Sequence, residues 1–409
     1  MAAEGPISLE DARAAVLAAA APLAAVEVPL GEALGMHLAA DVVADSPLQR
    51  FDNSAMDGYA VRAADLNAAG PASPVALAVA GEARAGHPAE AAVGAGEAIA
   101  ISTGAMLPDG ADTVVRVEDT SRADGRVEIL VAPAAGANVR RAGEDVAAGQ
   151  TVLRRGDALG PAALGLLAAL GVEAVACHRR PRVALLTSGD ELVPPGEPLP
   201  PGGIRDSNST TLAALVTRAG GEPQRLGVAG DTLASTVAAL EPALAADAVI
   251  VCGGISVGEH DHVKAALEQL GVERYFWRVA LRPGGPAFFG HRGSTLVFGL
   301  PGNPVSVFAT FTLLAAPSLA ALAGGSPTRH RTVASLGAAY ENGSGRTEAV
   351  RCGLELSDRG WVATPRPRQG SHVLTSLLDA DCLAIVPPEA KRLEAGDRVE
   401  IELLPRFLG

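Results

Sequence analysis

Lysine is almost absent from this chain: Lys264 and Lys391 are the only two among 409 residues. Basic charge comes instead from arginine, and 46 acidic residues outweigh 33 basic ones, which gives a net charge of −13. This acidic balance argues against nucleic acid as the main partner and is typical of a protein that stays in solution. Any anion site must therefore be local, built by loops and a few arginines.

Cysteine and aromatic residues are also scarce. Four widely spaced cysteines form no C-x-x-C pair, which indicates a reducing compartment, and the N-terminus lacks the basic start and apolar core of a signal peptide. We therefore expect a cytoplasmic protein. The apolar run 305–323 contains Pro317 and has no charged flanks, which favours a buried helix over a membrane span.

At 409 residues the chain is too long for one ordinary core, so we expect two or more domains. Ser8, with Asp11 three residues later, predicts a helix from Leu9 to about Ala21. Short β-prone runs then alternate with Gly, Pro and Asp turns, which is typical of an all-β module. A helix over 161–170 follows, and if it packs on the first helix, the β module is an insertion.

From Arg180 the chain alternates strand and helix, which predicts a mostly parallel sheet with helices on both faces. The last 80 or so residues are strand-rich and predict a small β-barrel-like domain. The fold class is therefore multidomain α/β plus β, with a central three-layer α/β domain. The predicted domains are an N-terminal helical and extended domain (1–47 plus 146–179), an inserted β module (48–145), the α/β domain (180–327) and a C-terminal β domain (328–409).

The stretch from Asp247 to Lys264 organises the predicted site. An apolar strand runs into Gly253 and Gly254, which permit a tight turn at positive φ, and a helix over 262–270 follows. A turn of this kind presents backbone N–H groups at the positive end of a helix dipole, which suits a phosphate. Taken alone, the pattern fits a plain tight turn equally well.

Polar or glycine-rich loops follow several strands of the predicted sheet. In such sheets ligands bind at the carboxyl ends of the strands. The loops expected there are Ser188–Glu191, Gly230–Asp231, Gly253–Asp261, Arg282–Pro286 and Gly299–Ser306. Their convergence on one edge favours a ligand site over five unrelated turns.

Six motifs occur in order along the chain: FDNSAMDGYA (51–60), TGA (103–105), RAGED (141–145), SGDEL (188–192), GGISVG (253–258) and LPGNPVS (300–306). This combination resembles the molybdopterin molybdenumtransferase (MoeA) family, which includes the gephyrin E domain, over essentially the whole chain. The resemblance implies an elongated four-domain homodimer. It implies that adenylylated molybdopterin and molybdate are substrates, that AMP is released, and that molybdenum enters the dithiolene with Mg²⁺ as cofactor.

The resemblance also implies an active site between the α/β domain of one subunit and the β module of the other. Asp57 and Glu191 would be its principal acids, and as carboxylates they would bind the metal ion or orient the attacking water. Thr103 and Asp145 are carried over as further catalytic residues. Each acid also has a plainer interpretation, Asp57 as a turn former and Glu191 or Asp190 as a turn cap.

The predicted substrate contacts lie mainly on the loops at the sheet edge. They are Gly253, Gly254, Ser256, Gly258, Asp231, Asp261, Arg282, Pro301, Asn303, Pro304 and Ser306. The amides of 253–258 would hold phosphate or molybdate, and Arg282 stands where relatives often have lysine. Gly285 stands where some relatives have a second lysine, a departure that bears on molybdate affinity. Asp52 and Asn53 are expected to hold their loop, and His260 and His262 are interpreted as incidental.

Two other functions compete with this interpretation. One is a non-catalytic, pterin-binding dimeric scaffold, against which the presence of Asp57 and Glu191 argues. The other is the molybdopterin adenylyltransferase, which would need neither the Asp57 module nor a C-terminal β domain. That adenylyltransferase is also the candidate partner that supplies substrate, and neither nucleic acid nor membrane is expected as a partner.

Overall fold

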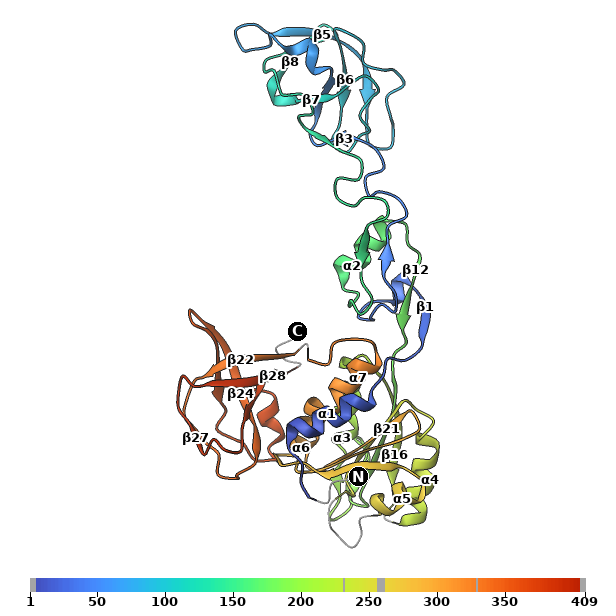
Figure 1. The fold of residues 1–409 in the computed structure, drawn as a ribbon, viewed down its shortest axis with the longest axis vertical. Helices are drawn as coiled ribbons and strands as arrows, with labels where there is room; N and C mark the ends of the chain where they lie inside the picture. Colours follow the sequence, from blue (N-terminus) through green and yellow to red (C-terminus); the bar gives the residue numbers. More distant parts are fainter. Residues whose placement is uncertain (1–4, 231, 256–261, 329, 405–409) are drawn as a thin grey trace. The chain divides into compact units, whose positions relative to one another are not determined.

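The structure is a computed structural model that describes residues 5–230, 232–255, 262–328 and 330–404. The chain divides into two compact units, both visible in Figure 1. The α/β–barrel unit comprises residues 1–39, 156–160 and 175–409, and the β-module unit comprises residues 40–155 and 161–174. Each unit therefore draws on segments that are distant in the sequence.

One six-stranded sheet forms the body of the β-module unit, with the order β7-β4-β6-β5-β9-β8. Its strands are β4 (Gly58–Val61), β5 (Val75–Ala83), β6 (Glu97–Ile101), β7 (Thr113–Arg116), β8 (Thr120–Ala123) and β9 (Arg126–Ile129). Tyr59 and Val61 are buried on one face and Ala60 on the other, because successive residues of a strand alternate sides. The β-prone runs predicted from the sequence are confirmed as strands.

Short elements complete this unit. They are β2 (Val42–Val43) paired with β11 (Thr151–Leu153), β3 (Asn53–Ser54) paired with β10 (Val139–Arg140), the 3₁₀ turns η2 (Ala63–Leu66) and η3 (Val117–Asp119), and helix α2 (Pro161–Ala169). The antiparallel pairing of β3 with β10 joins the start of the module to its end. The six strands of the sheet lie between these two elements in the sequence.

A second six-stranded sheet lies in the α/β–barrel unit, with the order β16-β13-β17-β21-β20-β18. Its strands are β13 (Arg182–Ser188), β16 (Glu222–Ala229), β17 (Ala248–Cys252), β18 (Glu273–Arg278), β20 (Pro286–Arg292) and β21 (Thr295–Leu300). The first four strands in this order are parallel, and β20 and β18 are antiparallel additions. The strand–helix alternation did not predict those additions, because no helix separates β20 from β21.

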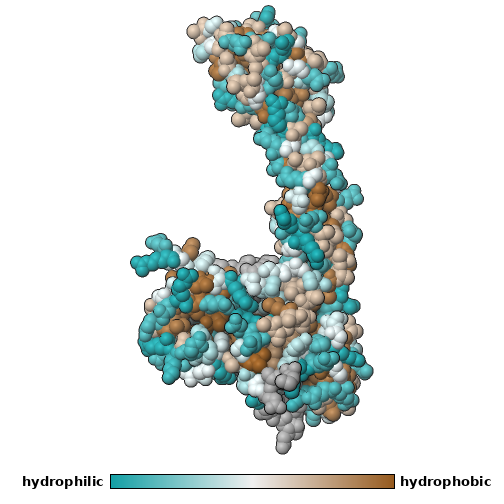
Figure 2. All heavy atoms as spheres, viewed as in Figure 1, coloured by the Kyte–Doolittle hydropathy of each residue, from teal (hydrophilic) through white to brown (hydrophobic). Residues whose placement is uncertain are grey.

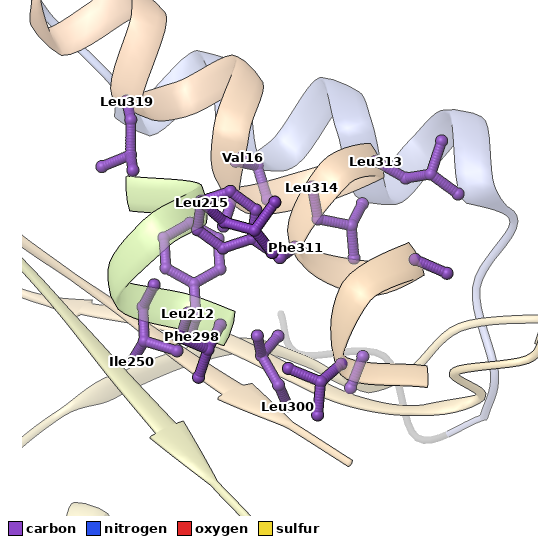
Figure 3. Packing of buried hydrophobic residues seen from close by; sticks show 14 of the residues in the cluster. Val16, Leu212, Leu215, Ile250, Phe298, Leu300, Phe311, Leu313, Leu314 and Leu319 are labelled. Atoms are coloured by element: carbon purple, nitrogen blue, oxygen red, sulfur yellow. The ribbon is translucent and has the colours of Figure 1, made fainter. Parts of the chain in front are cut away.

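Helices cover both faces of this sheet. α4 (Leu233–Ala243) and α5 (Val263–Gln269) pack on one face, and α3 (Asn208–Arg218) packs on the other. α1 (Leu9–Ala19) begins as predicted, because the Ser8 side chain accepts the Asp11 N–H at 3.0 Å. Its buried face joins the same core as α3, and Figure 3 shows Val16 beside Leu215 and Phe311. The suggested packing of the first helix on 161–170 is therefore wrong: α1 uses its apolar stripe against the α/β core.

The apolar run 305–323 is confirmed as a buried helix, with 72% of its most apolar window inside the fold. It consists of α6 (Pro304–Thr310), a π-helical turn η4 (Phe311–Ala315) and α7 (Ala316–Leu322). Pro317 has no N–H and crowds the preceding turn, and the wider turn absorbs this, with the Ala316 N–H bonded to Phe311 O. Figure 3 shows Phe311 and Leu314 of this segment near Leu300.

Five strands of the C-terminal region close into a barrel, as the sequence suggested. They are β22 (Arg331–Leu336), β24 (Thr347–Ser357), β25 (Gly360–Pro365), β26 (Cys382–Val386) and β28 (Arg398–Leu403). Closure follows because β24 pairs with both β25 and β26, while β22 and β28 complete the ring. Figure 2 shows hydrophobic residues among hydrophilic ones on the visible surface, and Leu356 of β24 is 70% exposed.

Several short elements complete the α/β–barrel unit. They are β1 (Ala25–Pro29) with β12 (Ala174–His178), β14 (Leu192–Val193) with β15 (Ile204–Arg205), β23 (Tyr340–Glu341) with β27 (Arg392–Leu393), β19 (Leu281–Arg282), and the 3₁₀ turns η1 (Leu30–Glu32) and η5 (Leu374–Leu377). β19 is the most informative of them, because it pairs in parallel with β24 of the barrel. The loop between β18 and β20 is thereby tied to the barrel.

Gly58 provides a test of the β-module packing. A Cβ at this position would lie 1.9 Å from Val115 O, so Gly58→Ala should destabilise the unit by about 2–3 kcal/mol. Gly81→Ala, in the same sheet with nothing within 4 Å, is the matched control and should change stability by less than about 1 kcal/mol. Urea unfolding followed by circular dichroism checks both, and equal stabilities for the two variants would contradict this packing.

Candidate functional site

The carboxyl ends of four parallel strands meet at one edge of the α/β sheet. Ser188 of β13 is paired with Ala229 of β16, and Cys252 of β17 is paired with both Thr187 and Leu300. The loops that follow these four strands therefore start side by side. This is the edge at which doubly wound sheets bind ligands.

The Gly253-Gly254 turn adopts the backbone expected from the sequence, with φ of 87° and 63°. A Cβ on Gly253 would lie 2.6 Å from Ser188 O, so both the conformation and the close approach require glycine. The Gly253 N–H donates to Leu300 O at 3.0 Å, and the Trp277 indole N–H donates to Ile255 O at 3.1 Å. Four predicted contacts lie outside the described residues: Asp231, Ser256, Gly258 and Asp261.

The turn after β21 is held by side chains from neighbouring elements. Asn208 donates from Nδ2 to Gly302 O at 2.7 Å, and the Cys252 thiol donates to Pro301 O at 3.5 Å. Burial, reinforced by the charge of Asp206, raises the pKa of Cys252 to about 12, so this thiol stays protonated and is not a nucleophile. Asn303 precedes α6 and Pro304 is its first residue, while Ser306 is buried within it.

A barrel loop reaches the same turn. The Asn303 side chain donates from Nδ2 to Ser371 Oγ at 3.3 Å, and the Val305 N–H donates to Ser371 O at 3.2 Å. Nothing in the local sequence around Ser371 signals this position. Its role follows only from how the barrel packs against α6.

Glu191 and Asp190 follow β13 and are both exposed. The Glu191 carboxylate folds back over Gly189, where a Cβ would lie 2.6 Å from Oε2. The backbone of this loop is anchored, because the Ile204 N–H donates to Glu191 O at 2.8 Å. Asp206, which sequence reasoning did not identify, is buried and accepts from Thr187 Oγ1 at 3.1 Å. This hydrogen bond fixes the last residues of β13.

Arg282 lies at the junction of the α/β sheet and the barrel. Its Nη1 donates to Glu348 Oε1 at 3.0 Å, and Tyr340 donates its hydroxyl to Glu348 Oε2 at 2.6 Å. Burial raises the pKa of Glu348, but the hydrogen bonds of Tyr340 and Ser344 and the charge of Arg282 outweigh it and leave the pKa below its ordinary value. Glu348 is therefore ionised, and Arg282 is already paired with a carboxylate.

Arg351 is the largest fully buried side chain in the described structure and was not predicted as a site residue. Its Nη2 donates to Arg368 O at 3.0 Å and to Gly370 O at 3.3 Å, while Nε and Nη1 have no partner. Burial lowers the pKa of this guanidinium, which nevertheless stays protonated at neutral pH. A charged residue within the apolar run of β24 is a sequence signal that could have identified it.

In the β-module unit, Asp57 and Thr103 are brought together. Asp57 Oδ1 accepts the Thr103 N–H at 2.7 Å and the Thr103 hydroxyl at 3.0 Å. These two hydrogen bonds, the backbone one first, lower the pKa of Asp57 below its usual 3.8 although the carboxylate is exposed. Asp57 is thus held as an oriented, ionised carboxylate at the surface of the module.

Asp145 belongs to a neighbouring loop that Asp52 anchors. Asp52 accepts the Ala142 N–H at 2.8 Å and pairs with Arg141, which confirms that it holds its loop. Asp145 itself is exposed. The loops that carry Asp57, Thr103 and Asp145 are therefore fastened to one another, whereas Glu191 and Arg282 belong to the other unit.

No cluster of three or more His, Cys, Asp and Glu side chains suited to a metal ion occurs among the described residues. The exposed carboxylates of Asp57 and Glu191 are oxygen ligands of the kind that hard divalent cations prefer.

A mostly parallel α/β sheet with a glycine turn at its edge, together with a closed barrel and a carboxylate-bearing β module, defines a multidomain α/β plus β protein with a candidate ligand site at the sheet edge. Three family models match in order: the MoeA N-terminal region, domains I and II (7–171), a probable molybdopterin binding domain (184–321) and the MoeA C-terminal region, domain IV (333–404). The chain belongs to the MoeA, or molybdopterin molybdenumtransferase, family.

Individual relatives agree. The chain is 37% identical to the molybdopterin molybdenumtransferase of Haemophilus influenzae, over 93% of this chain and 94% of that protein. It is 40% identical to molybdopterin molybdenumtransferase 2 of Mycobacterium tuberculosis, over 92% and 94%. A crystal structure of the molybdopterin biosynthesis MoeA protein from Pyrococcus horikoshii matches with a TM-score of 0.82 at 36% identity, over 98% and 99%. The resemblance inferred from the six motifs is confirmed.

The hydrogen bonds of Asp57 can be tested by titration. Thr103→Val removes the hydroxyl but keeps the backbone N–H, so the pKa of Asp57 should rise and still stay below 3.8. Because a depressed pKa stabilises the fold above the unfolded value and loses this effect as pH falls through the folded pKa, the variant should lose the contribution at a higher pH. The carboxyl ¹³C shift of Asp57, assigned with Asp57→Asn, reports it, and an unchanged pKa would refute the contact.

Proposed function

We propose that this protein inserts molybdenum from molybdate into adenylylated molybdopterin, with cleavage of the phosphoanhydride and release of AMP. The general part of this statement, a transferase of molybdenum cofactor biosynthesis, follows from family membership. The observation that carries the finer part is the pairing register of β16, β13, β17 and β21, which starts four polar loops side by side. We further propose a cytoplasmic enzyme, supplied with substrate by an adenylyltransferase.

The pterin nucleotide would bind at this edge. Backbone N–H groups of the glycine turn from Gly253 to Gly258, with Ser256, would hold the phosphates, and Asp231 and Asp261 would contact the same ligand. Support comes from the positive φ of Gly253 and Gly254 and from their close fit against Ser188. A fixed turn without side chains lets a phosphate approach the backbone closely.

Molybdate would bind next to the turn after β21. Pro301, Asn303, Pro304 and Ser306 line the start of α6, and Arg282 supplies positive charge from the adjoining loop. The buried guanidinium of Arg351, with two nitrogens unbonded, adds charge on the barrel side of this turn. Oxyanion recognition needs such fixed donors, because the chain as a whole carries −13.

The carboxylates would serve the cleavage step. Asp57 and Glu191 would bind Mg²⁺ or orient the attacking water at the adenylyl phosphorus, with Thr103 and Asp145 beside Asp57. When bound, Mg²⁺ neutralises phosphate charge. Thr103 contributes directly, because its two donors fix the direction of the Asp57 carboxylate and lower its pKa.

The site as proposed takes Asp57 and Glu191 from different subunits of a homodimer. The four-domain division is part of this proposal: 1–47 plus 146–179, 48–145, 180–327 and 328–409, with helix α1 of the first segment packed on the core of the third. In support, the two carboxylates belong to separately packed units of the chain. A β module that reaches a second subunit would complete the edge of that subunit.

Two other candidates, the scaffold and the adenylyltransferase, explain less. A scaffold has no use for an exposed carboxylate that two donors hold in one direction, as the N–H and hydroxyl of Thr103 hold Asp57. An adenylyltransferase would need only the α/β domain, whereas this chain also matches the MoeA N-terminal and C-terminal regions. Adenylylation of free molybdopterin by ATP would favour the adenylyltransferase. Tight pterin binding without AMP release would favour the scaffold.

Charge removal at the two acids is the first test of the proposed activity. Asp57→Asn and Glu191→Gln should each lower molybdate-dependent AMP release at least about tenfold, which is about 1.4 kcal/mol of barrier, with folding intact. Asp358→Asn, in an exposed barrel turn, is the matched control and should be as active as wild type. Wild-type rates for both acid variants would remove these residues from the site.

Subunit sharing is tested by mixing the two inactive variants. Asp57→Asn subunits retain Glu191, and Glu191→Gln subunits retain Asp57, so a mixed dimer contains one complete site if the acids come from different subunits. Co-expression should then restore about a quarter of wild-type activity, because half of randomly formed dimers are mixed and each holds one of two sites. A co-expressed sample as inactive as its parents would mean that both acids come from one subunit.

A further inference from the structure

Three arginines and a single carboxylate meet where the β18–β20 loop joins the barrel. Arg282 comes from the loop, Arg346 directly precedes β24, and Glu348 and Arg351 lie in the first half of β24. Pairing of Leu281 with Thr347 and of Arg282 with Glu348 brings the two segments together. Such a surplus of positive charge is notable in a chain of net charge −13.

Arg346 occupies the space beside Gly285. A Cβ built on Gly285 would lie 3.1 Å from Arg346 Nη1, and the same nitrogen donates to Leu281 O at 3.5 Å. Gly285 does not have the positive φ that would demand glycine. The absence of a side chain at position 285 therefore leaves room that a guanidinium from the barrel fills.

Of the three arginines, Arg346 has the fewest interactions that would satisfy its charge. Arg282 is paired with Glu348, and Arg351 is buried and donates to two carbonyl groups of its own barrel loop. Arg346 is exposed, and among the described residues no carboxylate lies within ion-pair distance of it. A planar guanidinium in this position can bind a tetrahedral oxyanion through two N–H groups.

We propose that Arg346 supplies a second cationic contact to molybdate at the Arg282 loop, from the space that Gly285 leaves open because it has no side chain. This inference rests on the proposed function, because it takes molybdate as the anion of this junction.

The test separates molybdate affinity from turnover. Arg346→Ala should raise the molybdate concentration for half-maximal AMP release about tenfold, or about 1.4 kcal/mol, with the rate at saturating molybdate nearly unchanged. Arg359→Ala removes the same charge from an exposed barrel turn and should leave the molybdate dependence unchanged. Equal molybdate dependence for Arg346→Ala and wild type would overturn the proposal.

A rescue variant tests the position. With the guanidinium gone, the double variant Arg346→Ala, Gly285→Lys has room for the new side chain, apart from a 3.2 Å approach of its Cβ to Leu281 O. Recovery of molybdate affinity to within about threefold of wild type would support the exchange. A folded double variant no better than Arg346→Ala would refute it.

Calorimetric titration with sodium molybdate distinguishes failure of this inference from failure of the proposed function. Weaker binding by Arg346→Ala than by wild type and Arg359→Ala supports the role of Arg346, even if wild type releases no AMP. Equal binding by all three proteins, while wild type does release AMP, overturns the role of Arg346 alone. Absence of molybdate binding by wild type overturns both.

Discussion

Parallel alignment of four strands is the constraint on which the candidate site depends. Because Cys252 is in register with both Thr187 and Leu300, the turns after β13, β17 and β21 begin at the same level. The Gly253 N–H bond to Leu300 O and the tight approach of Gly253 to Ser188 O then leave the turn no freedom. A side chain at position 253 would push the turn away from Ser188 and so disrupt the candidate site at this edge.

Charge is distributed so that an acidic protein can still bind anions. In the β module, the N–H and hydroxyl of Thr103 donate to the exposed Asp57 carboxylate and fix its direction. At the junction with the barrel, Glu348 accepts from Nη1 of the exposed Arg282 side chain, while Arg346 and Arg351 have no ion pair among the described residues. Negative charge and positive charge thus serve different parts of the proposed reaction, the carboxylate near the phosphoanhydride and the guanidinium groups near the oxyanion.

Local patterns predicted most of what they can encode. The Ser8 cap, the β-prone runs, the glycine turn at Gly253 and the buried helix after Pro304 all depend on neighbouring residues, and all are present. The partner against which an element packs is not encoded locally. The apolar stripe of α1 shows that the helix is buried, but it does not show which part of the protein covers it. Ser371 escaped prediction for the same reason, since it reaches the α6 turn through the packing of a separate barrel. Arg351 differs, because its charge within the apolar run of β24 was a local signal, and only its contact with Gly370 O depends on how the barrel folds.

The barrel is consequently part of the candidate site. It is attached to the ligand edge twice, through the β19–β24 pairing at the Arg282 loop and through Ser371 at the start of α6. A body attached at two loops restricts both of them, so the spacing between Arg282 and Asn303 is set by the barrel as much as by the sheet. This explains how a chain with only two lysines can place positive charge here: Arg346 and Arg351, distant in sequence from Arg282, come to the Arg282 loop with the barrel.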